Sequence, residues 1–432
     1  MKYKSGFMGM GAKALALVLL VGVGNSVLAA NKVVAWGNSR YGGDNNAVQN
    51  VTDVEHIYHT ELAFMALKTD GTVVTWGHEN NGGDSSAVAD QLKNVKSITT
   101  SMGAAAALKA DGTVVTWGPQ WYGGDSSAVQ EKLTGVKKII SCGYAFAALK
   151  SDGTVVTWGM DDSAVAAQLT NVREVYASGG AFAALKANGT VVTWGDSNYG
   201  GDSSAVSGEL KFIKHIYSNH RTFAAEKYDG SLVTWGLDYY LGDTSGLAGL
   251  TNIKQVVANE DAFAALTSDS KVVTWGLAPK GGDFSQVSGY QQHVRAIYPL
   301  TGGFAGIEHY GSVFAWGTVT TGDYREKNFV PSSSSAIAVN VNSKAFALLE
   351  AGGTVKSMAK ANGGAITEFD NVISLSATSS AFAAIKADGS VHTWGSSFTG
   401  GDSSSIAAQL VNVKTIVGNN MAFAAIVLDE AN

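Results

Sequence analysis

The sequence predicts an all-β protein, a β-propeller of about ten three-stranded blades with about 40 residues in each blade. Three observations predict this fold class: a Trp-Gly pair that recurs along the chain, a turn-forming pair between two strand-like runs in most units, and complementary fragments of one unit at the two ends of the chain. Repeats of this period are typical of architectures in which one supersecondary unit packs against the next.

The Trp-Gly pair recurs at intervals of 36 to 42 residues over nearly the whole sequence. The pairs begin at Trp36, Trp76, Trp117, Trp158, Trp194, Trp235, Trp275, Trp316 and Trp394, and a degenerate copy falls at Met358. The unit after Trp158 is short, because Met160-Asp161-Asp162 replaces the Tyr-Gly-Gly-Asp stretch of other units.

Each unit contains three strand-like runs, as in residues 136–139, 181–186 and 190–194. A two-residue turn is expected between the second and third runs, since pairs such as Asp-Gly accept the positive φ angles of a tight hairpin. The pairs are Asp70-Gly71, Asp111-Gly112, Asp152-Gly153, Asn188-Gly189, Asp229-Gly230 and Asp388-Gly389, with Asp269-Ser270, Tyr310-Gly311 and Gly352-Gly353 as departures. The runs are apolar on both faces, which predicts sheets that are covered on both sides.

The ends of the chain carry incomplete units. The first unit has only a third strand, residues 32–36, and the last has only the first two strands, residues 413–416 and 422–426. Together these fragments make one blade. We therefore expect a ring closed by pairing of the N- and C-terminal half-blades, which removes exposed sheet edges. The alternative, an open solenoid, more often has polar capping repeats.

Residues 1–29 are predicted to be a signal peptide and residues 30–432 to be the repeat propeller. Three lysines precede an apolar run over residues 14–23, and Val27 and Ala29 stand at the small-residue positions of a cleavage site. The run is shorter than the ~20 apolar residues of a membrane span, so no membrane insertion is expected. These features predict a secreted or periplasmic protein.

The net charge is −6, and cleavage would remove three lysines and no acid, leaving −6 − 3 = −9. An acidic protein is a poor partner for nucleic acids and anionic membranes, so neither is expected. Cys142 is the only cysteine, which excludes an intramolecular disulfide. We interpret it as a small buried hydrophobic residue rather than a nucleophile.

The repeated pattern Ala-Leu-Lys-x-Asp-Gly-Thr-Val-x-x-Trp-Gly resembles the repeat of the regulator of chromosome condensation family, and it covers residues 32–427. The compact unit is most similar to the bacterial secreted branch, which includes the propeller-type β-lactamase inhibitor protein. The resemblance implies a rigid noncatalytic propeller that binds proteins through its loops. The signal peptide and the acidic charge argue against the nuclear exchange-factor role. Tyr-Gly-Gly-Asp-Ser-Ser replaces the usual Gly-Gln-Leu-Gly, so no binding residue is transferred from the family.

The commonest polar motif is Gly-Gly-Asp-Ser-Ser, whose acids are Asp44, Asp84, Asp125, Asp202, Asp243, Asp283, Asp323 and Asp402. One carboxylate per loop is too few for Ca²⁺, which takes six or more oxygen ligands, so a capping or Asx-turn role is the favoured interpretation. The eight histidines show no metal-ligand spacing, and the mature chain has no nucleophile elbow or phosphate-binding loop. We therefore expect neither an enzyme nor a cofactor.

Two loops vary between units: the loop after the first strand (the first-strand loop) and the loop after Trp-Gly (the Trp-Gly loop). Both are expected on one face of the propeller. Varied side chains with several aromatics suit a recognition surface for a protein partner or, alternatively, for a glycan. The candidate binding residues are Tyr41, His59, Glu61, Trp121, Tyr122, Tyr144, Tyr199, His220, Arg221, Tyr239, Tyr240, Glu260 and Asp261. A competing interpretation is that the aromatics merely pack over the glycines of their own loops.

Overall fold

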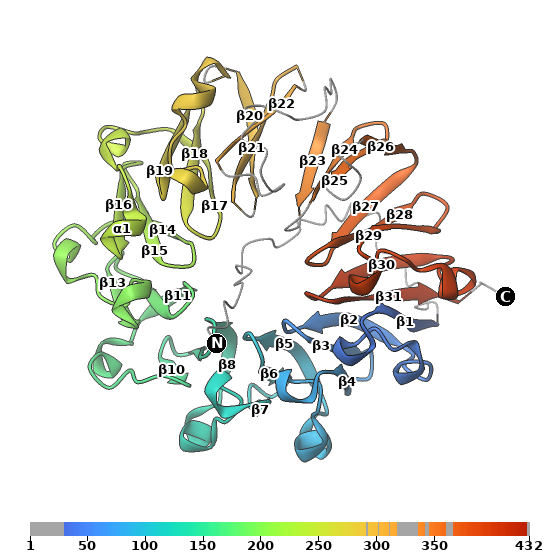
Figure 1. Ribbon diagram of the computed structural model, residues 1–432. Coiled ribbons are helices and arrows are strands. Elements are labelled where there is room, and N and C mark those ends of the chain that lie inside the picture. Colours follow the sequence, from blue (N-terminus) through green and yellow to red (C-terminus); the bar gives the residue numbers. More distant parts are fainter. Residues whose placement is uncertain are drawn as a thin grey trace, which may run out of the picture. The chain divides into compact units, whose positions relative to one another are not determined.

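The computed structural model describes residues 30–290, 293–300, 302–310, 312–317, 336–341, 345–359 and 366–429. Over this part of the chain the strands form ten sheets, nine of three strands and one of four. The sheets are the blades of an all-β propeller fold (Figure 1), which confirms the predicted fold class. The predicted signal peptide, Asp323 and the turn at Gly311 lie outside the described residues.

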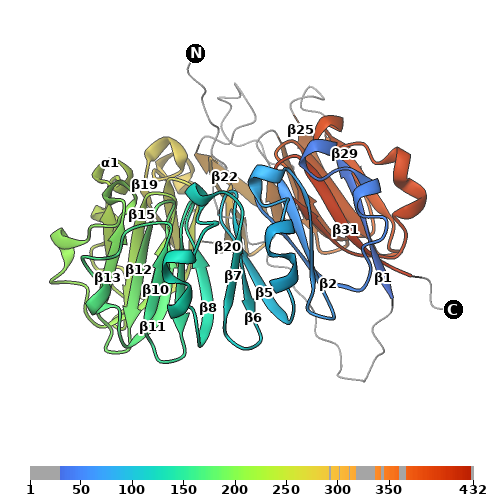
Figure 2. The ribbon, with the colours of Figure 1, turned by 90° about the horizontal axis from the view of Figure 1, so that it is seen from below.

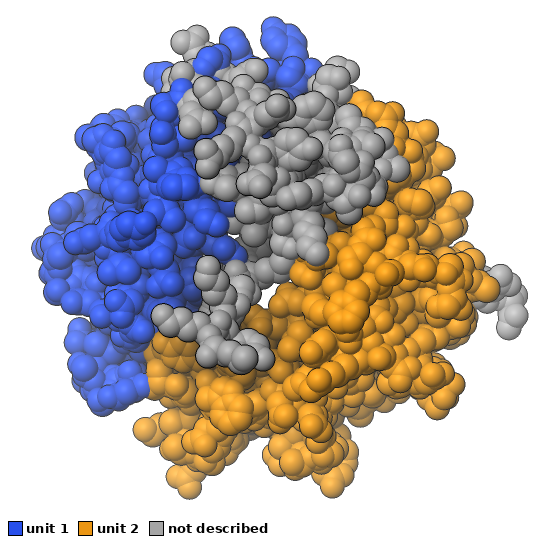
Figure 3. All heavy atoms as spheres, in the orientation of Figure 1, with its two compact units in different colours: residues 1–12, 152–155, 161–341 blue, residues 13–151, 156–160, 342–432 orange. Residues whose placement is uncertain are grey.

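The chain divides into two compact units (Figure 3). Unit 1 comprises residues 1–12, 152–155 and 161–341, and unit 2 comprises residues 13–151, 156–160 and 342–432.

The sheets of unit 1 are β11 (Val172–Ala177), β12 (Ala181–Lys186) and β13 (Val191–Gly195); β14 (Ile213–Ser218), β15 (Thr222–Lys227) and β16 (Leu232–Gly236); β17 (Ile253–Ala258), β18 (Ala262–Thr267) and β19 (Val272–Gly276); and β20 (Val294–Leu300), β21 (Gly303–Glu308) and β22 (Val313–Gly317). Strand β23 (Ala336–Val341) follows them.

The sheets of unit 2 are β1 (Asn31–Gly37), β31 (Ala422–Leu428) and β30 (Val413–Gly418); β2 (Val54–His59), β3 (Ala63–Lys68) and β4 (Val73–Gly77); β5 (Val95–Thr100), β6 (Ala105–Lys109) and β7 (Val114–Trp117); β8 (Val136–Ser141), β9 (Phe146–Lys150) and β10 (Val155–Trp158); and β27 (Val372–Ala377), β28 (Ala381–Lys386) and β29 (Val391–Gly395). Strands β24 (Ala345–Glu350), β25 (Val355–Ala359) and β26 (Ile366–Phe369) also belong to this unit. β25 contains the degenerate repeat at Met358, and β26 extends its sheet beyond the predicted three strands.

Helical segments are short and lie mostly in the Trp-Gly loops. The one α-helical turn among the described residues is α1 (Asp238–Leu241). The 3-10 turns are η1 (Ser39–Tyr41), η2 (Asn45–Ala47), η3 (Glu79–Asn81), η4 (Ser86–Gln91), η5 (Gln120–Tyr122), η6 (Ser127–Lys132), η7 (Ala166–Gln168), η8 (Ser197–Tyr199), η9 (Ser204–Val206), η10 (Ser245–Leu247), η11 (Ala278–Lys280), η12 (Ser285–Tyr290), η14 (Ser397–Thr399) and η15 (Ser404–Gln409). Within the described ranges, no helix is long and apolar enough to cross a membrane.

The hydrophobic core lies between neighbouring sheets and is built around the second strand of each. In β12, Phe182 is fully buried and stacks on Trp194 of β13, with ring centroids 5.3 Å apart. The other side of β12 presents Ala181 and Ala183, which pack against the next sheet. Small side chains at these positions let neighbouring sheets approach closely, and the burial of both faces excludes water from the contact.

In six of the described sheets the repeated tryptophan ties the sheet to the loop before it. Its indole N–H donates to the carbonyl of the first loop glycine of the preceding unit, and these glycines have φ between +82° and +101°, which favours residues without a Cβ. The pairs are Trp36 with Gly400, Trp76 with Gly42, Trp117 with Gly82, Trp158 with Gly123, Trp235 with Gly200, and Trp316 with Gly281, at 2.9 to 3.1 Å.

The two ends of the chain form one sheet, as predicted. Strand β1 pairs with β31 over its whole length, from Asn31 opposite Leu428 to Gly37 opposite Ala422 (Figures 1 and 2). β31 in turn pairs with β30. This sheet lies wholly within unit 2, and it leaves neither terminal fragment without a partner.

The predicted two-residue turn is wrong in length. Lys68 N–H donates to the Thr72 carbonyl and Gly71 N–H donates to the Lys68 carbonyl, each at 2.9 Å, so the loop contains three residues. Gly71 has φ +78°. The Asp70 carboxylate accepts hydrogen bonds from the Thr72 hydroxyl and N–H, which hold its pKa below the ordinary value. A type I turn followed by one left-handed residue is the usual geometry of such hairpins.

The first strands are not apolar on both faces, which corrects a second expectation. Every described first strand in a three-stranded sheet has a β-bulge at its second residue, as between Val95 and Ser97 of β5. The bulged residue is exposed, as Lys96 is. A bulge removes one residue from the ladder and turns its side chain outward.

Candidate recognition surface

The first-strand loops of adjacent sheets are joined by backbone hydrogen bonds. In unit 1, Gly179 N–H donates to the His220 carbonyl at 2.8 Å, and His220 N–H donates to the Glu260 carbonyl at 3.0 Å. In unit 2, Asn420 N–H donates to the Glu61 carbonyl at 3.0 Å, and Glu61 N–H donates to the Met102 carbonyl at 3.2 Å. Because only backbone atoms take part, the side chains at this position can vary without loss of the scaffold.

The Trp-Gly loop of a sheet is fastened to the first-strand loop of the same sheet. The carbonyl of Tyr122 accepts from the Ser101 hydroxyl at 2.7 Å, and the carbonyl of Tyr199 accepts from the Ser178 hydroxyl at 2.6 Å. The Asn419 side-chain amide donates in the same way to Tyr41 at 2.8 Å. Both variable loops therefore lie at the same end of each of these sheets, as predicted.

The predicted loop aromatics fall into two groups. Tyr41, Tyr122 and Tyr199, five residues after the repeated tryptophan, are half-buried. Tyr122 packs so closely over Gly103 that a Cβ there would lie 2.5 Å from its ring. The glycine under Tyr122 belongs to the first-strand loop, not to its own loop. Tyr41 stacks on His78, and Tyr199 packs against His220.

The position four residues after the tryptophan points into solvent. Trp121 and Tyr239 occupy it, and each is 70% exposed. Phe398 occupies the same position and is 62% exposed, although it is not among the predicted binding residues. Its place four residues after Trp394 was the signal that could have identified it.

Five of the predicted residues meet in unit 1, and we call them the stacked-arginine cluster: Tyr199, His220, Arg221, Tyr239 and Tyr240. The Arg221 guanidinium lies 5.0 Å from the ring centroid of Tyr199 and 4.7 Å from that of Tyr240. The rings of Tyr199 and His220 are 5.1 Å apart, as are those of Tyr239 and Tyr240. Partial burial, and next the charge of Arg221, lower the pKa of His220.

Glu260 and Asp261 lie beside this cluster. Glu260 accepts the backbone hydrogen bond of His220, and the charge of Asp261 acts on the His220 ring. The structure thus brings seven of the thirteen candidate residues together in unit 1. The other six belong to several sheets of unit 2: Tyr41, His59, Glu61, Trp121, Tyr122 and Tyr144.

The loop that carries Tyr239 and Tyr240 departs from the repeat. In regular loops the first glycine has positive φ, and a Cβ on Gly200 or Gly281 would lie 2.7 Å from the phenylalanine ring of the next sheet. Leu241 stands at this position, and it can accept neither the contact nor the φ angle. The chain instead forms α1, and Gly242 bridges to Gly276 of the next sheet.

This displacement leaves two buried donors without hydrogen-bond partners among the described residues, namely the Trp275 indole N–H and the Asn219 side-chain amide. In the regular geometry the equivalent indole of Trp235 donates to Gly200, and the equivalent amide of Asn259 donates to Lys280 at 2.7 Å. An unpaired buried donor typically costs ~1–3 kcal/mol. The loop therefore presents its two tyrosines in a conformation that is locally unfavourable.

Replacing Leu241 by Gly restores the Tyr-Gly-Gly-Asp sequence of regular loops and is expected to stabilise the protein. Recovery of two buried hydrogen bonds, less the entropy cost of glycine, should raise the free energy of unfolding by about 1–2 kcal/mol. Urea denaturation would measure the change. Leu241→Ala is the matched control, since it shortens the side chain without favouring positive φ, and an equal gain in that variant would contradict the explanation.

The Gly-Gly-Asp-Ser-Ser acids close Asx turns, as the favoured interpretation predicted. Each carboxylate accepts from the backbone N–H two residues on, at 2.8 to 3.0 Å, in all motifs within the described ranges: Asp44, Asp84, Asp125, Asp202, Asp243, Asp283 and Asp402. No group of three or more potential metal ligands is found in the described part of the chain. Cys142 is fully buried, and burial raises the pKa of its thiol to about 11, as expected of a residue that is not a nucleophile.

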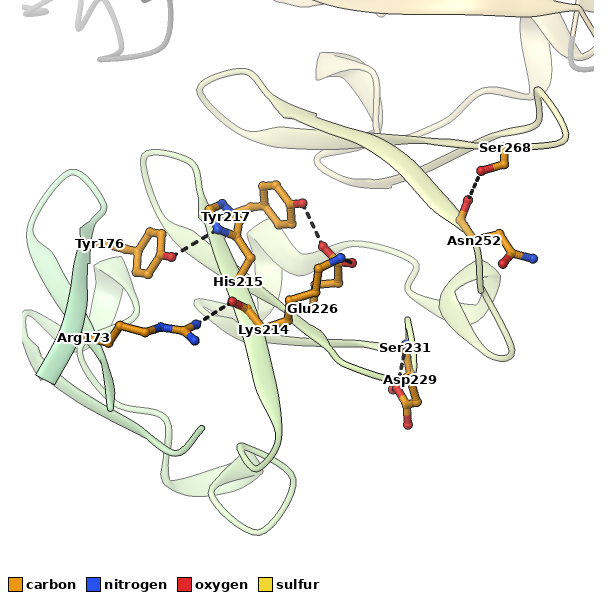
Figure 4. A network of polar contacts seen from close by, with 10 residues as sticks. All are labelled: Arg173, Tyr176, Lys214, His215, Tyr217, Glu226, Asp229, Ser231, Asn252 and Ser268. Atoms are coloured by element: carbon orange, nitrogen blue, oxygen red, sulfur yellow. Dashed lines mark hydrogen bonds and ion pairs between the residues drawn. The ribbon is translucent and has the colours of Figure 1, made fainter. Parts of the chain in front are cut away.

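A second polar network crosses the first strands of unit 1 (Figure 4). Glu226 is buried, and its carboxylate accepts from the Lys214 ammonium at 2.7 Å and the Tyr217 hydroxyl at 2.9 Å. Burial, and next Glu226, raise the pKa of Tyr217. His215 lies between Tyr217 and Tyr176, and its Nδ1 is 3.1 Å from the Tyr176 hydroxyl. This network replaces a leucine that other second strands carry, such as Leu185.

Replacing Glu226 by Leu, the usual residue at this position, should leave the free energy of unfolding unchanged or raise it by up to ~2 kcal/mol. The reason is that desolvation of a buried ion pair offsets most of its attraction, while the half-exposed Lys214 can return to water. Glu226→Ala should instead lower it by ~2 kcal/mol, because it leaves a cavity. Thermal unfolding of both variants tests this, and a large loss in the leucine variant would show that the ion pair is needed for stability.

No protein-family model and no curated protein sequence matches the chain. Several solved structures are similar over most of its length. The crystal structure of Prp20p from Saccharomyces cerevisiae, described with its binding properties to Gsp1p and histones, has 12% identity and a TM-score of 0.38, and the match covers 94% of this chain and 93% of that chain. Human WBSCR16 has 13% identity and a TM-score of 0.35, with 93% of this chain and 100% of that chain covered. A crystal structure of Kap60 bound to yeast RCC1 (Prp20) also matches, with 13% identity and a TM-score of 0.38, and the match covers 94% of this chain and 90% of that chain.

Proposed function

We propose that the protein is an exported noncatalytic scaffold that binds a protein partner through the stacked-arginine cluster and the loops beside it. The displaced loop after β16 is the observation that carries the proposal. It leaves two buried donors unpaired while Tyr239 is 70% exposed. Departures from regular hydrogen bonding that persist on a regular scaffold are typical of functional sites.

A protein partner is favoured over a glycan by the arrangement of the rings. Stacking on sugars requires open aromatic faces, but in this cluster Arg221 occupies one face of both Tyr199 and Tyr240. Tyrosine, tryptophan and arginine in adjacent loops are the residues that dominate protein–protein interfaces. The glycan alternative retains the exposed Trp121, Tyr239 and Phe398, and a glycan array would support it if binding depended on them.

The test is affinity capture from the extracellular fluid of the producing organism. Bait proteins would be the wild type, Tyr239→Ala, and Tyr310→Ala as a matched control. Tyr310 is 82% exposed in the turn after β21, at the opposite end of its sheet. The proposal expects a protein that the wild type and the control retain and that Tyr239→Ala loses. Equal retention by all three baits would contradict the proposed surface.

Export predicts that the mature protein begins at Ala30, because Val27 and Ala29 stand at the small-residue positions of a cleavage site. Intact-mass measurement of the protein from the extracellular or periplasmic fraction would detect this N-terminus. Soluble protein in that fraction that retains Met1 would contradict the prediction.

A further inference from the structure

The Arg221 guanidinium packs over two aromatic rings. The rings are those of Tyr199, from the Trp-Gly loop of the preceding sheet, and Tyr240 of α1. Its backbone N–H donates to the Asn219 side chain at 2.9 Å, which fixes the loop beneath it. Two aromatic faces restrict the rotation of the guanidinium plane, so little conformational entropy remains to be lost when a ligand binds in that plane.

The in-plane donors of Arg221 have no partner among the described residues. No hydrogen bond joins the guanidinium to another described residue, and no described carboxylate lies within ion-pair distance of it. A guanidinium carries five N–H donors in a fork that matches a planar two-oxygen acceptor. The side chain is half-buried, so an ion pair formed there would be less screened by water than one at a fully exposed position.

We propose that Arg221 binds a carboxylate of the partner, from an acidic side chain or a C-terminus. Both carboxylate oxygens would accept hydrogen bonds from the guanidinium in its own plane. This inference rests on the proposed function. The surrounding charges favour a carboxylate over a phosphate. Asp238 begins α1, and Glu260 and Asp261 follow in the next first-strand loop. These acids would repel a dianion more strongly than a singly charged carboxylate.

The experiment follows the arginine Nε–Hε resonances of the full chain by NMR during titration with sodium N-acetylglutamate, with sodium chloride at equal ionic strength as the reference. The chain has five arginines, and Arg221→Lys identifies the signal. Arg40 is the internal control, because it lies 5.9 Å from a single ring, that of Tyr41. We expect a saturable shift at Arg221, no saturable shift at Arg40, and ~tenfold weaker binding in Tyr240→Ala, the effect of losing ~1.4 kcal/mol of binding free energy.

The absence of a saturable shift at Arg221, or an equal one at Arg40, would overturn the inference. Tighter binding of inorganic phosphate than of N-acetylglutamate would also overturn it, in favour of a phosphate site. Capture that depends on Tyr239 but is unchanged in Arg221→Lys overturns the carboxylate inference alone. Capture that does not depend on Tyr239 overturns the proposed function, whatever the titration shows.

Discussion

Deletion of residues 31–37 is expected to lower the free energy of unfolding by at least ~5 kcal/mol. The deletion removes the buried side chains of Val33, Val34, Ala35 and Trp36, and burial of a large apolar side chain contributes ~1.5–3 kcal/mol. It also leaves one edge of β31 without its partner strand. Natural domains are stable by only ~5–15 kcal/mol, so this single loss is comparable to the whole stability of a domain.

Thermal unfolding and hydrogen exchange of the truncated protein would measure the effect. Lys32→Ala is the matched control, since it leaves the backbone pairing of β1 intact and changes a half-buried polar side chain. A synthetic peptide of residues 30–44, added in trans, should restore part of the lost stability. A truncated protein that melts at the wild-type temperature would show that the terminal sheet contributes little.

The second large effect concerns binding. The double change Tyr239→Ala with Tyr240→Ala should weaken capture of the partner at least thirtyfold, because truncation of an aromatic anchor in an interface typically costs ~2 kcal/mol or more. Removal of Tyr240 also uncovers one face of Arg221. Calorimetry with the captured partner would measure the change in Kd.

Asp111→Asn is the control for this pair of changes. Asp111 lies in a turn between second and third strands, and asparagine preserves the hydrogen bonds that its side chain accepts from Thr113. Unchanged melting temperatures in both variants would show that a loss of binding is not caused by unfolding. If affinity responded to Asp111→Asn but not to the tyrosines, the recognition surface would lie at the other end of the sheets.

The sequence was sufficient to predict the features that depend on periodicity. The spacing of Trp36, Trp76 and their equivalents predicted the sheets, and the two incomplete terminal units predicted the pairing of β1 with β31. Burial of Cys142 and the Asx turns followed from residue type and local context. Each of these rests on short-range geometry that repeats in every unit.

The features that escaped prediction depend on contacts between units of the repeat. Leu241 was visible as a departure from Gly-Gly, but its consequence requires the ring of the next sheet, against which a Cβ at that position would collide. The difference in exposure between Tyr239 and Tyr199 likewise escaped prediction. Tyr239, four residues after its tryptophan, is exposed and Tyr199, five residues after its own, is half-buried, and this depends on which of the two loop positions points into solvent. The bulges that expose Lys96 and its equivalents arise from strand pairing, and the hydrophobic pattern alone does not reveal this pairing.

The indole hydrogen bonds also bear on the order in which the protein can fold. Trp76 and Trp117 find their acceptors 34 and 35 residues earlier in the chain, whereas Trp36 bonds to Gly400, which lies 364 residues later. Most sheets can therefore form soon after their own residues have been synthesised. Strand β1, in contrast, cannot pair until β31 has been synthesised. Contacts of such long sequence separation form slowly. The terminal sheet of unit 2 is thus completed later than the other sheets, because β1 can pair only after the residues of β31 have been synthesised.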